Sequence, residues 1–204
     1  MKKELCIDKG EEHLIRVDKT LAAIIDRHGP CSLSKRSDYF AVLCESIISQ
    51  QLSVKAADTI HRRFCGLFDG STPKPCELLI FDDEIIRGIG ISKQKTGYLK
   101  DLSEKIISLD INPSEFDSMG DEDIINVLTK VKGIGRWTAE MFLIFALNRS
   151  DVLPVDDLGL KKAVWFQYKL KEMPGSDRIR EIAGRWHPFA TLATWYLWRS
   201  IENK

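Results

Sequence analysis

The stretch Val131-Lys132-Gly133-Ile134-Gly135-Arg136 separates two helical patterns and carries two glycines one residue apart. Glycine tolerates positive φ and lets another part of the backbone approach closely, so the stretch predicts a tight turn between two helices. The helix beginning at Arg136 leaves the N–H groups of its first turn without intrahelical partners, and such groups bind anions with the help of the helix dipole. The alternative interpretation is a plain short turn between antiparallel helices.

The residues around the two glycines favour the anion-binding interpretation. Val131 and Ile134 are apolar and are expected to anchor the turn in the core. Arg136 adds a cation and Thr138 a hydroxyl near the helix start, while Lys132 is expected to be solvated. A phosphate could then be held largely by backbone amides.

The sequence on both sides of this turn is helical in its spacing. Apolar residues recur at steps of three and four almost throughout, and no run alternates at period two. The patterns predict an all-α fold of about ten short helices, with neither a repeat nor a low-complexity segment. The later helices are expected at residues 80–87, 94–109, 121–130, 136–147, 158–168, 176–186 and 188–202.

Composition and charge restrict the possible classes of protein. The chain of 204 residues is 44% hydrophobic and 29% charged, which is ordinary for a soluble protein. No apolar run approaches the roughly 20 residues that span a bilayer, and the charged N-terminus lacks a signal peptide, so an intracellular protein is expected, in cytoplasm, nucleoid or nucleus. The 30 basic and 30 acidic residues cancel, so a nucleic-acid partner would need a locally basic face or backbone amides to hold its phosphates.

The cysteines predict neither a disulfide framework nor a metal site. There are five, an odd number, and no two are spaced as in a zinc knuckle. None follows Cys76, which excludes a C-terminal iron–sulfur cluster held by four thiolates. No metal and no cofactor is therefore expected; whether the hairpin turn binds a monovalent cation stays open.

Several motifs together resemble one family. The segment from Val131 to Ala139 resembles the hairpin signature of the helix-hairpin-helix DNA glycosylases. Ile47-Ile48-Ser49-Gln50-Gln51-Leu52, Gly90-Ile91-Ser92-Lys93-Gln94-Lys95 and the tail Arg185-Trp186-His187-Pro188-Phe189 to Arg199 are similar to segments of 3-methyladenine DNA glycosylase II and its short yeast-type relatives. The resemblance runs from about Phe40 to Arg199, and the N-terminal β domain of the longer bacterial enzymes is missing.

This resemblance implies an all-α fold of two helical lobes with an active-site cleft between them. Residues 1–39 are expected to pack with a C-terminal lobe at 160–204, and residues 40–159 to form the other lobe, ending in the helix-hairpin-helix at about 121–147. The implied partner is duplex DNA holding a damaged base, with no membrane, and the implied state is a monomer.

The family follows its hairpin with a Gly/Pro-rich loop and an aspartate, and Leu153-Pro154-Val155-Asp156-Asp157-Leu158-Gly159 stands in that place. A carboxylate stabilises the positive charge that develops on the sugar as a glycosidic bond breaks, and it can orient the attacking water. Asp156 and Asp157 are both candidates, and an N-cap for the helix at Leu158 is the alternative role. The resemblance favours Asp157 as the catalytic residue.

The resemblance also implies the type of reaction. Bifunctional relatives carry a lysine two residues after the second hairpin glycine, which forms a Schiff base with the sugar. Trp137 occupies that position here, so a monofunctional enzyme that uses water is expected. An alkylated base is already cationic and needs no general acid, which favours alkylated bases over neutral ones. The alternatives are a glycosylase for hypoxanthine, uracil or an oxidised purine, and a non-catalytic DNA-binding module.

The base pocket and the DNA contacts complete the expectation. A cationic base attracts aromatic faces, so Trp137 and Trp198 are expected to form pocket walls, with Tyr196 and Met141 as further candidates. Core packing is the alternative for each, and Trp165, Trp186 and Trp195 are assigned to the core. Gln51, with Leu52, is expected to fill the hole left by the flipped base, and a solvent-exposed amide pair is the alternative. Lys93 and Lys95 are expected at a second phosphate, or else on a solvated face.

Overall fold

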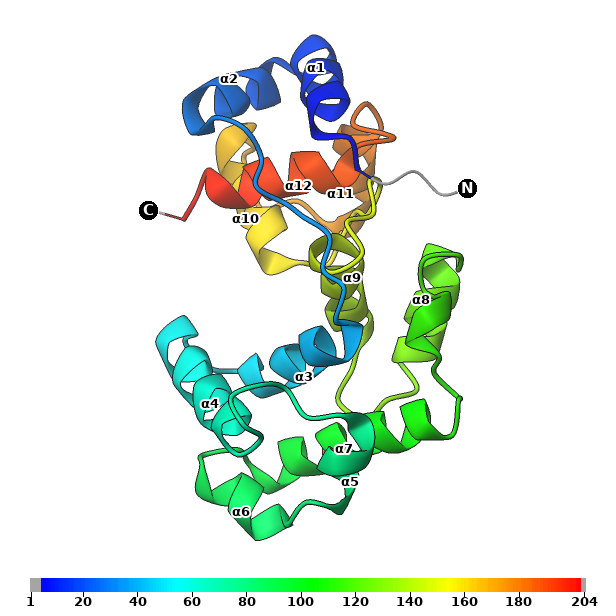
Figure 1. Ribbon diagram of the computed structural model, residues 1–204. Helices are drawn as coiled ribbons and strands as arrows, with labels where there is room; N and C mark the ends of the chain where they lie inside the picture. Colours follow the sequence, from blue (N-terminus) through cyan, green and yellow to red (C-terminus); the bar gives the residue numbers. More distant parts are fainter. Residues whose placement is uncertain (1–4, 203–204) are drawn as a thin grey trace. The chain divides into compact units, whose positions relative to one another are not determined.

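The chain is helical throughout the part described by a computed structural model, residues 5–202 (Figure 1). The described part holds twelve α-helices, one 3₁₀ helix and no strand, which confirms the predicted all-α class. The α-helices are α1 (Ile7–Val17), α2 (Lys19–His28), α3 (Tyr39–Ser49), α4 (Val54–Gly66), α5 (Pro75–Ile80), α6 (Asp83–Gly88), α7 (Lys93–Ile107), α8 (Asp121–Leu128), α9 (Arg136–Phe145), α10 (Leu158–Gln167), α11 (Ser176–Ala183) and α12 (Ala190–Arg199). The 3₁₀ helix η1 covers Pro113–Glu115. No helix in residues 5–202 is long and apolar enough to cross a membrane.

Capping residues explain why the middle of the chain has more helices than the spacing predicted. The predicted helix at 80–87 corresponds to α6, and a separate helix, α5, precedes it. Pro75 begins α5, where its missing N–H is no loss, and the Lys74 N–H donates to Glu77 Oε2 at 2.8 Å. Asp82 then caps α6 by accepting from the Glu84 N–H at 2.7 Å.

The described chain forms two compact units. Unit 1 comprises residues 5–35 and 143–202, and unit 2 comprises residues 36–142. Residues 143–159 were expected in the same lobe as the hairpin, but this segment belongs to unit 1. Its backbone is bound there: the Leu5 N–H donates to Asn148 O at 3.1 Å, and the Thr191 hydroxyl donates to Arg149 O at 2.6 Å.

Unit 1 is built around α12, which packs against α1, α2 and α10 (Figure 1). Its core includes an isolated carboxylate. Asp18 is 3% exposed, caps α2 through the Thr20 N–H, and accepts hydrogen bonds from the Tyr168 hydroxyl at 2.7 Å and the Trp186 indole at 3.1 Å. Four donors, counting the Leu21 N–H, therefore satisfy a charge that burial would otherwise penalise. Trp186 is fully buried, as its assignment to the core requires.

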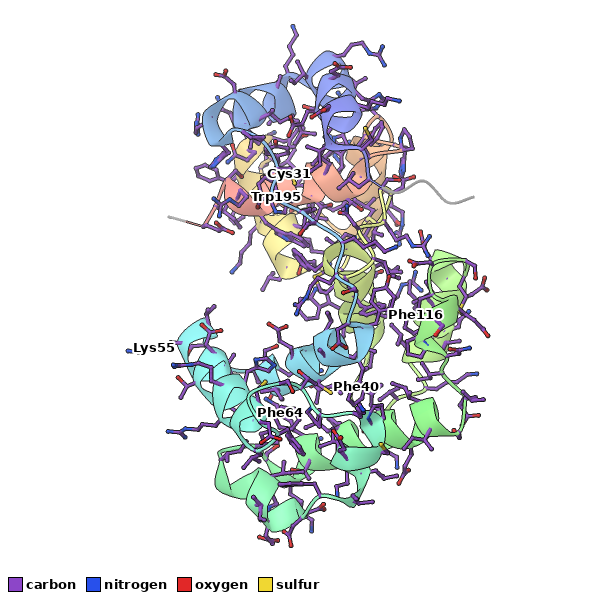
Figure 2. The ribbon with its side chains drawn as sticks, viewed as in Figure 1. Cys31, Phe40, Lys55, Phe64, Phe116 and Trp195 are labelled. Atoms are coloured by element: carbon purple, nitrogen blue, oxygen red, sulfur yellow. The ribbon has the colours of Figure 1, made fainter. Side chains whose placement is uncertain are left out.

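Unit 2 is organised by α7, which packs against α3, α5 and α6, while α4 packs against α3. Phe64 on α4 is fully buried in this core, and Lys55 on the same helix points away from it (Figure 2). A second cluster consists of Tyr39, Phe116 and Phe142, whose ring centroids lie 5.4–5.9 Å apart. This cluster joins α3, the segment after η1 and α9, and α3 in turn packs against α7.

Candidate functional site

The hairpin turn lies between α8 and α9 and depends on one of its two glycines. Gly133 has φ +84°, and a Cβ at this position would overlap the ring of Tyr98. Val131 and Ile134 are both buried, and the Ile134 N–H closes the turn on Val131 O at 3.1 Å. Gly135 has no positive φ and open space around it. The turn therefore needs glycine at position 133, whereas a side chain at position 135 would meet neither strain nor a neighbour.

A buried carboxylate on α7 fixes the hairpin. The Lys132 N–H donates to Asp101 Oδ2 at 2.9 Å, and Lys105 Nζ lies 3.1 Å from Asp101 Oδ1. Desolvation acts to raise the pKa of Asp101, but the hydrogen bonds from Lys132 and Lys105, together with their charges, outweigh it and lower that pKa. Asp101 is therefore an ionised anchor that ties the turn to α7.

The side-chain charges of the hairpin are matched locally. Arg136 forms ion pairs with Glu122 and Glu140, and its hydrogen bond to Glu122 raises the pKa of Arg136 and lowers that of Glu122. Lys132 is exposed, with Nζ 3.5 Å from Asp101 Oδ1. Thr138, predicted to offer its hydroxyl, is 6% exposed. Arg136 is therefore engaged with carboxylates, and the predicted role of its charge at a phosphate is correspondingly weakened.

The backbone of the turn offers donors instead. Within residues 5–202, the N–H groups of Gly133, Gly135 and Arg136 make no hydrogen bond to another residue. Gly133, Gly135 and Arg136 are all exposed, and Arg136 begins α9, where the dipole favours an anion. The turn can thus bind an anion by amides alone.

The loop after α3 was predicted to carry a wedge. Here "wedge loop" means residues 50–52. Gln51 is exposed and has φ +58°, a conformation that costs a non-glycine residue roughly 1–3 kcal/mol. Leu52 is also exposed, at 38%. The neighbouring Gln50 does something else: its amide donates to Gly133 O at 2.9 Å, so it joins the wedge loop to the hairpin.

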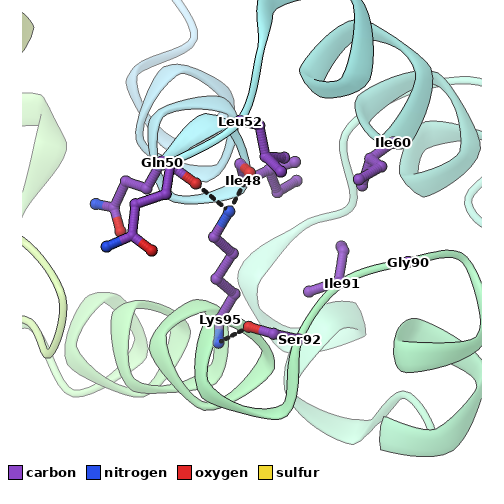
Figure 3. A pocket seen from close by; sticks show the side chains of 9 residues that line it. Ile48, Gln50, Leu52, Ile60, Gly90, Ile91, Ser92 and Lys95 are labelled. Atoms are coloured by element: carbon purple, nitrogen blue, oxygen red, sulfur yellow. Dashed lines mark hydrogen bonds between the residues drawn. The ribbon is translucent and has the colours of Figure 1, made fainter.

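The position of Lys95 argues against its predicted role at a phosphate. Its Nζ donates to Ile48 O at 2.7 Å and to Gln50 O at 2.6 Å, at the end of α3 (Figure 3). Desolvation by burial lowers the pKa of Lys95. Lys93, on the first turn of α7, is exposed, in keeping with either of its predicted roles.

The two adjacent aspartates belong to unit 1 and have different hydrogen-bond partners. Asp157 is the N-cap of α10: its Oδ1 accepts from the Leu160 N–H at 2.6 Å and also from the Trp198 indole at 2.8 Å. Asp156 is 76% exposed and accepts from the Ser176 hydroxyl at 2.6 Å. That hydrogen bond lowers the pKa of Asp156, desolvation acts in the opposite direction, and the hydrogen bond and charge of Lys161 add to the lowering. The sequence left capping and catalysis open for both aspartates, and the N-cap is Asp157, the residue that the resemblance favours for catalysis.

An aromatic pair lies beside Asp157. The Trp198 ring stacks on Phe145, with centroids 5.8 Å apart and planes 18° apart. A Cβ at Gly159 would lie 3.1 Å from Asp157 Oδ1 and 3.2 Å from the Trp198 indole, so glycine leaves room for their hydrogen bond. Phe145 was not among the pocket residues predicted from the sequence. Its signal was available, because Trp137, Met141 and Phe145 recur every four residues along one face of α9.

The other predicted pocket residues differ in exposure. Trp137 is 49% exposed and Met141 is half-buried. Tyr196 is fully buried, and its hydroxyl donates to Gly29 O at 2.9 Å and contacts Glu11, so it offers no face to a base. Trp195 is half-buried, with Arg199 over its ring, and Trp165 is 42% exposed rather than in the core. In residues 5–202, no group of three or more His, Cys, Asp or Glu could hold a metal ion.

Comparisons with known proteins agree on one family. The DNA-3-methyladenine glycosylase 1 of Schizosaccharomyces pombe is 36% identical over 201 residues, which cover 96% of this chain and 88% of that protein. A solved structure of a Schizosaccharomyces pombe 3-methyladenine DNA glycosylase in complex with abasic DNA is 36% identical, has a TM-score of 0.85 and covers 94% of this chain and 96% of that one. A DNA-3-methyladenine glycosidase from Bacillus halodurans has a TM-score of 0.84 at 34% identity, over 97% of this chain and 92% of that one. Residues 44–188 match the HhH-GPD superfamily, and this chain therefore belongs to the HhH-GPD superfamily of base excision DNA repair proteins.

Proposed function

We propose that this protein is a monofunctional DNA glycosylase that removes alkylated bases of the 3-methyladenine and 7-methylguanine type from duplex DNA. It hydrolyses the N-glycosidic bond and leaves an abasic site. The relatives named above support the activity, since they are 34–36% identical over nearly the whole chain. The observation that carries the chemistry is the Asp157 carboxylate, held at the N-terminus of α10 against the Trp198 indole.

Asp157 is proposed as the catalytic carboxylate. Water adds to C1′ of the sugar as the C1′–N bond breaks, and the bonding electron pair leaves with the base. The sugar carries positive charge in the transition state, which the carboxylate stabilises while it accepts a proton from the water. Two donors bind Oδ1, so the carboxylate is held in one orientation before the substrate arrives.

The stacked pair Phe145 and Trp198 supports a preference for cationic bases. An aromatic face attracts a cation by roughly 0.5–2 kcal/mol beyond ordinary packing. A 3-methyladenine or 7-methylguanine base leaves its sugar as a neutral molecule, so it needs no proton from the enzyme. A neutral purine needs one. The carboxylate and the aromatic pair therefore suffice for the alkylated bases.

Unit 2 is proposed to hold the DNA. The exposed amides of the hairpin bind a backbone phosphate, and Gln51 enters the base stack when the target base leaves it. Trp137, which stands at the Schiff-base position of bifunctional relatives and cannot form that adduct, supports the monofunctional assignment. Trp137 and Met141 remain candidates for contacts with the base.

A base-release assay tests this function. Purified protein is incubated with methylated duplex DNA, and the released bases are identified and compared with release of hypoxanthine from a matched duplex under single turnover. We expect 3-methyladenine or 7-methylguanine to leave faster than hypoxanthine, and borohydride to trap no adduct on abasic DNA. DNA binding without release of any base would make the chain a non-catalytic module. Faster release of hypoxanthine would reverse the substrate preference, and an efficient adduct would make the enzyme bifunctional.

A further inference from the structure

A lysine on α7 binds the backbone of the wedge loop. Lys95 projects from α7, and its ammonium group donates to the carbonyls of Ile48 and Gln50, at 2.7 and 2.6 Å (Figure 3). These carbonyls lie at the end of α3, where backbone acceptors have no intrahelical partner, so the cation satisfies them and complements the negative end of the helix dipole. One cation thus binds the backbone just before Gln51.

The loop needs such support because its backbone is strained and its packing is incomplete. Gln51 adopts φ +58°, and strained residues of this kind persist only where the surroundings hold them. The loop borders a hollow of about 210 Å³, which is lined by Ile48, Leu52, Ile60 and Ile91 together with polar groups (Figure 3). Since this side of the loop faces a hollow, the hydrogen bonds of Lys95 carry much of its support.

The same face of α7 also holds the hairpin. Lys95, Tyr98 and Asp101 follow one another at steps of three, so they lie along one side of the helix. Tyr98 fills the space that a side chain at Gly133 would need, and Asp101 binds the Lys132 N–H. The Gln50 amide closes the arrangement by donating to Gly133 O. The wedge loop and the hairpin are therefore fixed to one helix and to each other.

We propose that Lys95 is a positioning residue that sets the register between the wedge and the phosphate held by the hairpin. The inference rests on the proposed roles of Gln51 and the hairpin. When the hairpin binds a phosphate, α7 and Lys95 deliver Gln51 to a fixed place in the base stack. Without the ammonium group the loop can relax from its strained conformation. Gln51 is then no longer held in the position from which it enters the base stack, while the contact between the hairpin and the phosphate remains.

The test compares two substrates that differ only in the cost of base flipping. One duplex carries the alkylated base opposite its normal partner, and the other carries it opposite an abasic-site analogue, where unstacking costs least. For Lys95→Met we expect single-turnover release from the paired duplex to fall about 10-fold relative to release from the unpaired one, because a misplaced wedge matters only where flipping is costly. The ratio of the two rates does not depend on how much of the variant is folded.

Three further variants sharpen the comparison. Gln51→Ala should change the ratio in the same direction, and Lys95→Arg should restore it, since a guanidinium can also donate to both carbonyls. Lys100→Met is the matched control: Lys100 is on α7, and its Nζ also donates to a backbone carbonyl, that of Phe81 at 2.7 Å. It removes the same charge and the same kind of bond, together with an ion pair to Asp83, away from the wedge loop, so its ratio should equal that of the wild type.

Salt dependence separates positioning from phosphate contact. A plot of the logarithm of the DNA-binding constant against the logarithm of the salt concentration has a negative slope, and loss of one phosphate-binding cation reduces the steepness of that slope by about 0.9. We expect Lys95→Met to leave the slope unchanged. A reduced slope, with equal loss of rate on both duplexes, would make Lys95 a phosphate ligand and overturn the proposal, as would wild-type rates on both duplexes. If the wild-type protein releases no base at all, the proposed function fails instead.

Discussion

Replacing Asp157 with asparagine should separate catalysis from stability. Both hydrogen bonds described for this side chain, from the Leu160 N–H and the Trp198 indole, end on the same oxygen, Oδ1. An asparagine can keep both bonds with its amide oxygen and place its amide nitrogen where Oδ2 was. The substitution therefore removes the charge while it preserves the cap of α10 and the orientation of the indole.

The two effects differ in size. A neutral acceptor in place of a carboxylate weakens each bond only partly, so Asp157→Asn should destabilise the protein by about 1 kcal/mol or less. Asp157→Ala removes both bonds and should cost about 2–3 kcal/mol, the sum of a lost cap and a lost side-chain bond. Loss of electrostatic stabilisation of the sugar should raise the barrier by about 3 kcal/mol, a fall in rate of at least 10²-fold.

Three measurements decide the outcome: single-turnover base release, urea unfolding and duplex affinity. We expect Asp157→Asn to lose activity with near-normal unfolding and binding. Asp156→Asn serves as the control, because Asp156 is exposed and bound to Ser176 on α11. Near-normal release by Asp157→Asn together with loss in Asp156→Asn would reverse the assignment. If the loss of rate only matched the loss of folded protein, the role of Asp157 would be structural.

Three further predictions concern the hairpin. Gly133→Ala should lower the free energy of unfolding in urea by roughly 2–4 kcal/mol, because the new side chain is strained at φ +84° and overlaps Tyr98. Gly135→Ala should lower it by less than about 1 kcal/mol. Equal losses of stability in the two variants would refute the distinction between the glycines. Gly135→Asp should weaken binding to all DNA sequences alike, because it places a negative charge beside the phosphate. The neutral Gly135→Asn should bind nearly as well as the wild type in fluorescence anisotropy. Equal affinities of the wild type and both variants would argue against amide binding of a phosphate. The pKa of Asp101 is lowered by folding, so its contribution to stability is present above the unfolded value of about 3.9 and is lost as pH falls through the folded value. The difference in unfolding free energy between the wild type and Asp101→Asn should therefore shrink below about pH 4, and a difference that grew there would contradict the anchor.

The hairpin was predictable from sequence because its determinants are local. A glycine that must adopt positive φ, an apolar residue that anchors the turn and a helix start all lie within a few residues of Gly133. The resemblance favoured Asp157, but the sequence pattern alone left Asp156 and Asp157 both open, because two aspartates precede the helix that begins at Leu158. What the pattern alone did not reveal is that one residue, Asp157, caps the helix and also binds an indole 41 positions away.

The incorrect predictions concern side chains whose partners are distant in sequence. Lys95 was expected at a phosphate, but its acceptors are carbonyls 45 and 47 positions away. The sequence of its own helix does not distinguish a lysine with such distant acceptors from a solvated lysine. Tyr196 is a different case, because helical geometry already separates it from Trp198: two residues apart on a helix means about 200° around its axis. Once Trp198 contacts Asp157, Tyr196 has to point into the core.

The zero net charge of the chain counted against a nucleic-acid partner, but the hairpin is built to bind a phosphate without an excess of basic side chains. Arg136 is paired with Glu122 and Glu140, and Lys132 lies near Asp101, so this turn carries little side-chain charge to offer a phosphate. Its exposed amides remain, and a fixed dipole at a helix start binds an anion without adding to the net charge. The ion pairs have a second consequence, since they hold α8, α7 and the first turn of α9 around those amides. These paired acidic and basic residues add nothing to the net charge, but they hold in place the backbone amides that can bind an anion.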